Sequence, residues 1–376
     1  MIILFVIDNY ESQSNGATIT TRRFREALMK RGHEVRVLTI SSKKENGIYA
    51  LKERELPLVT GIVHKQDTMF AKADKEIIKN ALTGVDICHL MYPFKLSRVT
   101  NEIAKEMGIP VITSYHIMPE NIVYGAGVRK YSFLFNWLVN SYFKSFYKKT
   151  PIIHAPSKMS ELSLKKYYPK SKIYTISNGV TDEFFTVKNN PSIDKIRIVS
   201  IGRYSKEKGQ DVTIKAIGNS IYRDKIELIL PGKGKQEKRL RKLAKKYNID
   251  VKFGFMSKLE LMETLSSAYL FIHSAEIEIE GMSCLEAIAA GVVPIISDSK
   301  KSASNQFSLT ANNLFKNRNS KDLTEKIEFW ISNPINRNQN ALDYRSFIEN
   351  YRICNSVDKF ETMFQENIKK WLYPSH

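Results

Sequence analysis

Two glutamates on either side of a glycine turn form the stretch of the chain best suited to chemistry. Glu278 and Glu286 are separated by seven residues in the run Glu278-Ile-Glu-Gly-Met-Ser-Cys-Leu-Glu286. The spacing of Ser283 and Glu286 is that of a capping box, which predicts a helix beginning near Ser283. The backbone N–H groups of residues 281–283 would then face an anion such as a phosphate. Carboxylates beside that anion could accept hydrogen bonds from the hydroxyls of a sugar or ribose.

The same residues also have a purely structural explanation. Glu286 could do no more than close the capping box, and Glu278 could be an exposed loop acid. Residue type and spacing alone leave both explanations open.

Two cations lie in a loop beyond a second predicted strand. Arg203 and Lys208 belong to Gly202-Arg-Tyr-Ser-Lys-Glu-Lys208-Gly209, which follows the strand predicted at 196–201. Ligands of parallel α/β sheets bind beyond the carboxyl ends of the strands, so both cations could converge on one diphosphate. Arginine offers a planar fork of donors and lysine a point charge. Solvated surface charge is the alternative for any such pair.

Both motifs resemble those of the retaining family 4 glycosyltransferases, which move a sugar from a nucleotide diphosphate to an acceptor. The match consists of Gly-Arg-x-x-x-Glu-Lys-Gly at 202–209 and Glu-Ala-x-Ala-x-Gly-x-x-Pro at 286–294, preceded by Glu278. The resemblance covers nearly the whole chain. It implies an α/β fold of two Rossmann-like, doubly wound parallel-sheet domains that face each other across a cleft, the GT-B fold.

The resemblance also implies the roles of individual residues. Glu278 and His116 would contact the transferred sugar and are the catalytic candidates, while Glu286 would bind the ribose hydroxyls. The residues expected to bind the donor are Gly16, Arg203, Lys208, Met256, Gly281, Met282, Ser283 and Glu286. Since Arg203 and Lys208 would neutralise the leaving diphosphate, as a metal does in other transferases, we expect neither a metal nor a cofactor besides the nucleotide sugar.

The first half of the chain alternates strands with helices, which predicts a parallel sheet. His116 follows the last of these strands by two residues, in a Thr-Ser-Tyr-His run that resembles the family's sugar-pocket histidine. Gly16 lies in the first strand-to-helix loop. The family usually has a pair of glycines in this loop, and here Asn15 takes the place of the first one. The predicted strands are 2–7, 35–39, 62–64, 87–90 and 111–114, and the predicted helices are about 18–30, 73–82 and 97–107.

The second half repeats this alternation after a polar linker at 188–194. We expect an acceptor-side domain at 1–187 and a nucleotide-sugar domain at 195–350, with a final helix at about 356–376 packing back on the first domain. Strands are predicted at 196–201, 227–230, 251–256, 270–273 and 292–296. Met256, at the end of one of them, is a candidate for the pocket of the nucleotide base.

The segment 129–149 is dense in aromatic residues, flanked by cations and empty of acids. As a helix it has the composition of an interfacial segment attracted to anionic lipid. The alternative is a core helix with lysines that reach solvent. The residues expected to contact the membrane are Arg129, Lys130, Phe133, Trp137, Lys144 and Lys148.

Composition limits the remaining possibilities. The 376 residues are 43% hydrophobic and suggest two domains, and the net charge of +19 favours an anionic partner, either nucleic acid or a membrane face, unless it serves only solubility. Cys88, Cys284 and Cys354 are far apart, which argues against disulfides or a zinc site and favours the cytoplasm. The opening apolar run is too short for a signal peptide, and no run is long enough to span a bilayer.

The expected function is hexosyl transfer, with retention, from UDP-glucose or UDP-galactose to diacylglycerol or a glycolipid, by an enzyme bound peripherally at the inner face of the cell membrane. The run Tyr-His-x-x-x-Glu-Asn at 115–121, followed by the basic aromatic segment, is similar to bacterial enzymes that glycosylate diacylglycerol. One alternative is a transferase that extends a capsular or wall polysaccharide on a lipid carrier. Another is a nucleic-acid-binding protein. Two observations argue against it: the cations are dispersed along the chain, and no motif that recognises RNA or DNA occurs.

Overall fold

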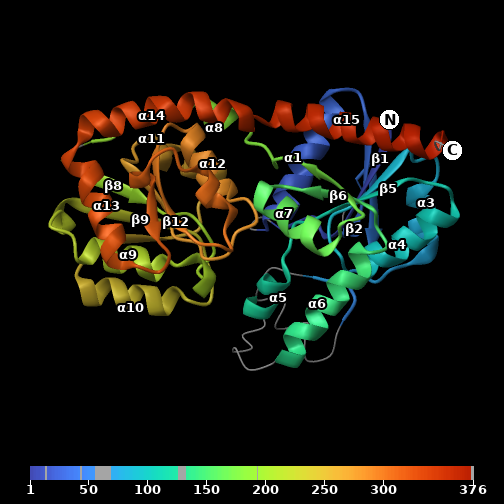
Figure 1. Ribbon diagram of the computed structural model, residues 1–376, viewed down its shortest axis with the longest axis horizontal. Helices are drawn as coiled ribbons and strands as arrows, with labels where there is room; N and C mark the ends of the chain where they lie inside the picture. Colours follow the sequence, from blue (N-terminus) through green and yellow to red (C-terminus); the bar gives the residue numbers. More distant parts are fainter. Residues whose placement is uncertain (13–14, 43–44, 56–68, 126–132, 193, 374–376) are drawn as a thin grey trace. The chain divides into compact units, whose positions relative to one another are not determined.

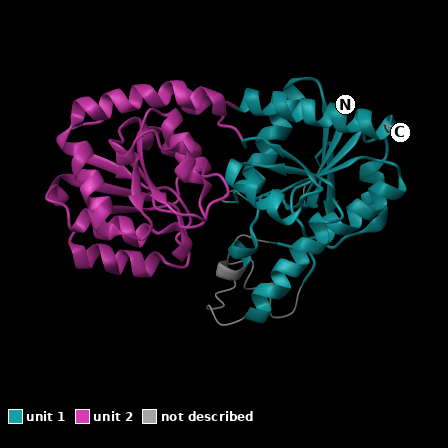
Figure 2. Cartoon of the chain, viewed as in Figure 1, with its two compact units in different colours: residues 1–178, 353–376 teal, residues 179–352 magenta. Residues whose placement is uncertain are grey.

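The computed structural model describes residues 1–12, 15–42, 45–55, 69–125, 133–192 and 194–373. Contacts within the chain divide it into two compact units (Figure 2). Unit 1 comprises residues 1–178 and 353–376, and unit 2 comprises residues 179–352. Both ends of the sequence therefore belong to unit 1, and unit 2 is one continuous segment.

Unit 1 is built on a sheet of parallel strands (Figure 1). The sheet has seven strands in the order β3-β2-β1-β4-β5-β6-β7. All neighbouring strands are parallel. The strand order reverses at β1, which lies between β2 and β4, and such a switch point is where open α/β sheets bind ligands. The strands are β1 (Ile2–Asn9), β2 (Glu34–Ile40), β3 (Ile48–Leu51), β4 (Ile87–Leu90), β5 (Val111–Ser114), β6 (Ile152–Ala155) and β7 (Lys172–Thr175).

The first and last helices of the sequence pack together on this sheet. Phe24 of α1 and Phe360 of α15 lie in one core with their ring centroids 4.2 Å apart. Arg31, at the end of α1, pairs with Asp358 at 2.5 Å and with Glu361 at 2.6 Å, both on α15. The helices of unit 1 are α1 (Gly16–Lys30), α3 (Lys75–Leu82), α4 (Lys95–Glu106), α5 (Pro119–Gly125), α6 (Phe133–Tyr147), α7 (Lys158–Tyr167) and α15 (Ile353–Leu372).

Unit 2 contains a second parallel sheet (Figure 1). This sheet has six strands in the order β10-β9-β8-β11-β12-β13. Its strands are β8 (Ile196–Val199), β9 (Ile226–Pro231), β10 (Asp250–Gly254), β11 (Leu270–His273), β12 (Val293–Asp298) and β13 (Leu314–Lys316). Its helices are α8 (Asp182–Phe185), α9 (Gln210–Gly218), α10 (Glu237–Tyr247), α11 (Lys258–Ser266), α12 (Met282–Ala289), α13 (Ser320–Ser332) and α14 (Pro334–Ile348).

Both faces of the unit 2 sheet are covered, as the central strand β11 shows. Leu270 and Ile272 belong to the core formed with α9, α10 and α13. Phe271, which points to the opposite face, belongs to the core formed with α11, α12 and α14. This two-sided burial explains why the strand is a continuous apolar run rather than an alternating one.

The strands predicted at 87–90, 111–114 and 270–273 are confirmed as β4, β5 and β11. The strand predicted at 62–64 lies outside the described residues. The first helix begins at Gly16 instead of about residue 18, because the side chain of Asn15 accepts a hydrogen bond from the Ala17 N–H and caps it. Within the described ranges, no helix has the length and apolar composition needed to cross a membrane.

Candidate active site

The loop that carries Arg203 and Lys208 is fixed against the end of β11 in unit 2. A short 3-10 turn over Lys206–Lys208 leads into Gly209, whose φ of 68° lies in the left-handed region. A Cβ at this glycine would collide with the carbonyl oxygen of Ser274, and the Ser274 hydroxyl donates to the Lys208 carbonyl at 2.9 Å. The glycine is therefore required for the close approach that places Lys208 at the carboxyl edge of the sheet.

Lys208 and Glu278 form an ion pair at this edge, between Lys208 Nζ and Glu278 Oε2. Their side chains are 19% and 20% exposed, so the pair remains reachable from solvent. His273, the last residue of β11, lies beside it with Nε2 3.7 Å from the same carboxylate oxygen. His273 belongs to no motif that could be singled out in the sequence, although its position at the end of a strand leading to Glu278 is a usable signal.

The carboxylate of Glu278 is held in its ionised form. Burial would raise its pKa, but Lys208, His273 and Arg203 outweigh that effect and hold the pKa below its ordinary value. Burial lowers the pKa of His273 to about 4, so this ring is neutral at pH 7. Glu278 is thus suited to accept hydrogen bonds from hydroxyls and not to act as a general acid.

The backbone around Glu278 is anchored on both sides. Its N–H donates to the Lys301 carbonyl at 3.1 Å, and its carbonyl accepts from the Ala303 N–H at 2.9 Å. These bonds form a short parallel bridge that holds the loop between β11 and α12. The carboxylate is therefore presented from a fixed backbone position.

The predicted capping box at the start of α12 is wrong. Gly281 is the N-cap, with a φ of 96° and no side-chain cap hydrogen bond, and the helix begins at Met282. A Cβ at Gly281 would collide with the hydroxyl of Ser304, so the chain can enter the helix here only through glycine. Ser283 therefore lies inside the helix and cannot cap it.

The helix itself is otherwise where the sequence predicts it, and its first-turn amides have no intrahelical acceptors. Met282 and Ser283 supply two of these amides, next to the Gly281 turn. Glu286 lies further along α12 and is 8% exposed. The N-terminus of α12 and the Lys208–Glu278 pair thus occupy the same edge of the unit 2 sheet.

Arg203 extends toward solvent near this pair. Its guanidinium lies 3.7 Å from Glu207, is 44% exposed, and contributes to the low pKa of Glu278. The Arg203 carbonyl accepts a hydrogen bond from Gln210 Nε2 at 2.9 Å, which fixes the backbone while leaving the side chain adjustable. An exposed guanidinium beside a paired lysine can bind a diphosphate without breaking a buried contact.

Met256 follows β10 and packs partly against the core formed with α12. Its sulfur accepts a hydrogen bond from the Thr264 hydroxyl at 3.5 Å. Its hydrogen bond is thus to Thr264 and not to the Lys208–Glu278 ion pair. The role of Met256 at a nucleotide base stays a prediction.

His116 and Gly16 belong to unit 1. His116 follows β5, and its Nε2 is buried without a hydrogen-bond partner among the described residues. Burial and the neighbouring His154 lower its pKa well below the ordinary value, which makes the ring neutral. Gly16 starts α1, and a Cβ built there would meet no described atom within 4 Å.

A chain of hydrogen-bonded, buried polar groups lies next to His116. The Ser114 hydroxyl lies 2.6 Å from His89 Nε2 and 2.9 Å from His154 Nδ1, and His154 Nε2 lies 2.7 Å from the Ile176 carbonyl. The His116 and His154 rings meet edge to face at 5.4 Å. The sequence did not predict this cluster, because its members come from separate strands.

The two halves of α6 differ in burial. Phe143, Phe146 and Tyr147 are buried in unit 1. Phe133 and Trp137 are 85% and 56% exposed, and Leu134 and Leu138 are also exposed. Lys144 and Lys148 are exposed as well, whereas Arg129 and Lys130 lie outside the described residues.

Over the ranges that the structure covers, no group of three or more His, Cys, Asp or Glu side chains is arranged to hold a metal ion.

Residues 14–184 match the family model described as Glycosyltransferase Family 4, and residues 182–346 match the one described as Glycosyl transferases group 1. The alpha-monoglucosyldiacylglycerol synthase of Streptococcus pneumoniae is 25% identical over 311 residues, which are 77% of this chain and 69% of that protein.

Two solved structures show the same fold. Sucrose-phosphate synthase from Thermosynechococcus elongatus has a TM-score of 0.75 at 14% identity, covering 97% of this chain and 98% of that one. HepE from Anabaena, in complex with UDP and glucose, has a TM-score of 0.74 at 14% identity, covering 97% and 100%. With two adjoining family models along the chain and two parallel-sheet units of this kind, the protein belongs to the group 1, family 4 glycosyltransferases of the GT-B fold.

Proposed function

We propose that this protein transfers a hexose, with retention, from UDP-glucose or UDP-galactose to a hydroxyl of diacylglycerol or a glycolipid. The observation that carries the donor side is the Lys208–Glu278 pair at the N-terminus of α12, with the exposed Arg203 beside it. The acceptor side is supported by the Streptococcus relative, whose name states that it is a glucosyldiacylglycerol synthase.

In this proposal the donor diphosphate binds Arg203, Lys208 and the backbone amides of residues 281–283. Positive charge and oriented amides would stabilise the negative charge that develops on the leaving phosphate. Because these groups supply that stabilisation, we propose that transfer needs no metal. The bond between the hexose and the phosphate breaks, a bond to the acceptor oxygen forms, and the acceptor proton passes to the leaving phosphate.

The sugar and nucleoside are assigned to the remaining side chains. Glu278 accepts hydrogen bonds from the hexose hydroxyls, Glu286 binds the ribose hydroxyls, and Met256 lies against the base. His116 contacts the hexose and Gly16 the donor. Glu278 is already paired with Lys208. When the donor binds, the Lys208 ammonium would lie between the Glu278 carboxylate and the diphosphate, so that neither anion is left unpaired.

We further propose that the protein works at the inner face of the cell membrane. Phe133, Leu134, Trp137 and Leu138 form an exposed apolar stretch at the start of α6, and Lys144 and Lys148 follow it. Apolar side chains combined with nearby cations favour binding to a bilayer that carries anionic lipid.

The test is release of nucleoside diphosphate from a panel of UDP-, GDP- and ADP-sugars in EDTA, with and without liposomes that contain diacylglycerol. Release from one UDP-hexose only with diacylglycerol is the expected result. Release that requires a soluble glycan would replace the lipid acceptor by a polysaccharide. No release from any donor, combined with salt-sensitive binding of nucleic acid, would reject the transferase proposal altogether.

A further inference from the structure

A pocket of about 230 Å³ lies in unit 1, at the end of the central strand β1. Ligand pockets for drug-sized molecules measure about 300–1,000 Å³, so this one suits a small headgroup rather than a whole lipid. The residues that line it come from β1, from the segments near residues 54 and 70, and from α4 and α6: Asp8, Arg54, Phe70, Ala71, Phe94, Lys95 and Tyr142.

Asp8 is the unusual member of this lining. Its side chain is 2% exposed, and Oδ1 accepts a hydrogen bond from the Ala71 N–H at 3.0 Å. The second oxygen, Oδ2, is buried and has no hydrogen-bond partner among the described residues. Burial raises the pKa of Asp8 to about 7, although the Ala71 bond opposes this. A buried carboxyl oxygen left unpaired is costly to the fold, which points to a ligand that pairs with it.

The walls of the pocket are aromatic and lead to the exposed part of α6. Phe70 and Phe94 meet edge to face at 5.0 Å. Tyr142 is one α6 turn beyond the exposed Leu138, and its ring is held by the Arg98 guanidinium at 4.0 Å. The pocket therefore lies next to the helix whose N-terminal half presents Phe133 and Trp137 to solvent.

The pocket is also connected to the loop that carries Gly16. The Phe94 ring lies 5.3 Å from the Tyr92 ring, and the Tyr92 hydroxyl donates to the side chain of Asn15 at 2.8 Å. Asn15 in turn caps α1 just before Gly16. A group bound in the pocket would thus lie at the switch point of the sheet, where β1 separates β2 from β4.

We infer that this pocket binds the hydroxyl-bearing headgroup of a diacylglycerol lipid, with Asp8 Oδ2 accepting a hydrogen bond from the hydroxyl and with Phe70, Phe94 and Tyr142 contacting the glycerol and the first acyl carbons. The inference rests on the proposed function for the identity of the lipid. Arg54 and Lys95 are exposed at the rim. Since the unpaired atom is a carboxylate oxygen, a hydroxyl donor fits it and a phosphate does not.

The test measures binding of short-chain dioctanoylglycerol to the full chain without any donor sugar, and compares it with the same lipid carrying a methyl ether in place of the hydroxyl. The measurement is made at about pH 8.5, above the pKa of Asp8. The wild-type protein is expected to prefer the hydroxyl lipid by about tenfold, because the ether oxygen cannot donate a hydrogen bond.

Asp8→Asn is the decisive variant. The Ala71 N–H keeps the amide oxygen on its side, so the amide NH₂ faces the pocket and can donate to the ether as well as to the hydroxyl. The tenfold preference should vanish, while the thermal midpoint stays equal or rises because no buried carboxylate remains. Glu106→Gln, an exposed change in the same unit, should leave the preference intact. Tyr142→Ala should weaken the binding of the hydroxyl lipid and of its methyl ether by the same factor.

A preference that persists in Asp8→Asn, or that is absent in the wild type, overturns the inference. Tighter binding of dioctanoyl phosphatidate, lost in Arg54→Ala and kept in Asp8→Asn, would assign the pocket to anions and also overturn it. Because no donor is present, these results do not depend on transfer. Lipid binding without any sugar transfer would therefore reject the proposed function and leave the pocket assignment standing.

Discussion

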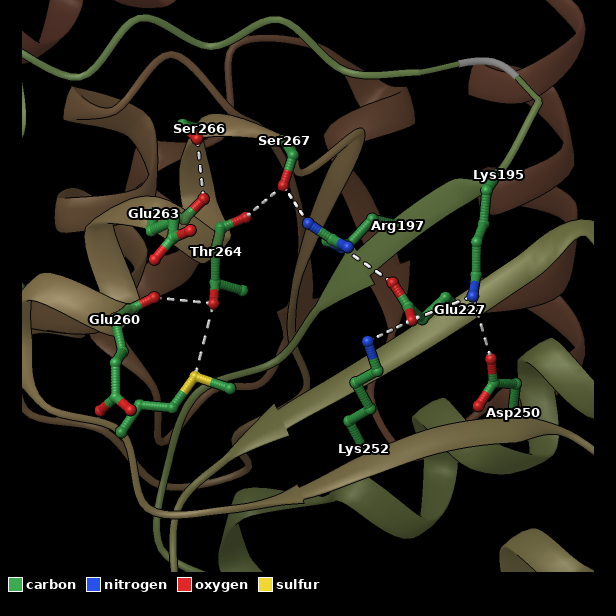
Figure 3. A network of polar contacts seen from close by, with 11 residues as sticks. Lys195, Arg197, Glu227, Asp250, Lys252, Glu260, Glu263, Thr264, Ser266 and Ser267 are labelled. Atoms are coloured by element: carbon green, nitrogen blue, oxygen red, sulfur yellow. Dashed lines mark hydrogen bonds and ion pairs between the residues drawn. The ribbon is translucent and has the colours of Figure 1, made fainter.

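Two glutamates of unit 2, at opposite ends of its sheet, are paired with cations in very different ways. Glu227 lies at the amino end of β9, is 1% exposed, and pairs with Lys195 at 3.1 Å, Arg197 at 2.9 Å and Lys252 at 2.7 Å (Figure 3). Glu278 lies beyond the carboxyl end of β11, is 20% exposed, and pairs with Lys208. Both carboxyl groups have lowered pKa values.

A low pKa therefore does not by itself mark a functional carboxylate in this protein. Glu227 is enclosed by cations of the neighbouring strands, and Arg197 also donates to Ser267, which continues the network to Thr264 (Figure 3). Because its carboxylate is already paired with three cations, this cluster is poorly suited to bind a ligand. Glu278 differs because its single lysine, a glycine turn and a helix N-terminus meet at an edge that solvent reaches.

The largest expected effect is on sugar transfer, which should depend on the Lys208–Glu278 edge and not on the cluster around Glu227. Lys208→Ala should lower kcat/KM for sugar transfer by about 10³-fold, because the leaving diphosphate loses a positioned charge. The matched control is Lys206→Ala, an exposed lysine of the same 3-10 turn, which should stay near wild type. Near-normal turnover in Lys208→Ala would remove the donor site from this edge.

The converse change should affect stability and spare catalysis. Glu227→Gln removes the buried partner of three cations and should lower the free energy of unfolding by about 3 kcal/mol. Denaturant titration measures this loss, and the kcat of the folded variant should remain unchanged. A stable variant with impaired transfer would mean that Glu227 has a functional role after all.

The pH dependence of stability should divide into two windows. The pKa of Glu227 is lowered to about 2, so its contribution is complete above about pH 4.5 and is lost as the pH falls toward 2. The pKa of His273 is lowered to about 4, so between about pH 6.5 and 4 the unfolded chain binds a proton that the native ring does not.

The contributions of these two groups to stability should therefore fall with decreasing pH, by about 2 kcal/mol between pH 5 and 3 for Glu227. Unfolding free energies of the wild type and of Glu227→Gln, measured across this range, should converge toward low pH. Parallel curves would show that Glu227 is not the titrating group.

The smallest effect concerns α6, in which one half of the helix is buried in unit 1 and the other half is exposed. Replacing Phe133 and Trp137 by Ser should weaken co-sedimentation with anionic liposomes by about tenfold, because both side chains are exposed and apolar. Ile335→Ser, an 83% exposed apolar position on α14, is the control. Unchanged co-sedimentation of the double variant would reject the membrane contact.

Local sequence patterns predicted many elements of the fold but few of the contacts between them. Short buried strands such as β4, β5 and β11 each contain adjacent apolar residues, and a single segment of the sequence is enough to reveal them. The capping-box prediction failed because the chain enters α12 at Gly281, in a left-handed conformation and packed against Ser304, so that Ser283 already lies inside the helix. Local spacing carries no information about such a neighbour.

The same limit applies to the sites. Arg203, Lys208 and Glu278 could be singled out because each lies in a motif that resembles a known family. The cluster around Glu227 and the pocket at Asp8 are assembled from side chains of several strands and helices, with no motif in any one of them. Only the folded chain shows that one carboxylate is enclosed and the other has an unpaired oxygen.

The most direct test of the donor site is equilibrium binding of UDP, measured by titration calorimetry on the wild type, Lys208→Ala, Lys206→Ala and Glu227→Gln. The expected result is a loss of affinity of about tenfold or more in Lys208→Ala alone. Equal affinity of all four proteins for UDP would contradict the assignment of the diphosphate to the edge formed by Lys208, Glu278 and the start of α12.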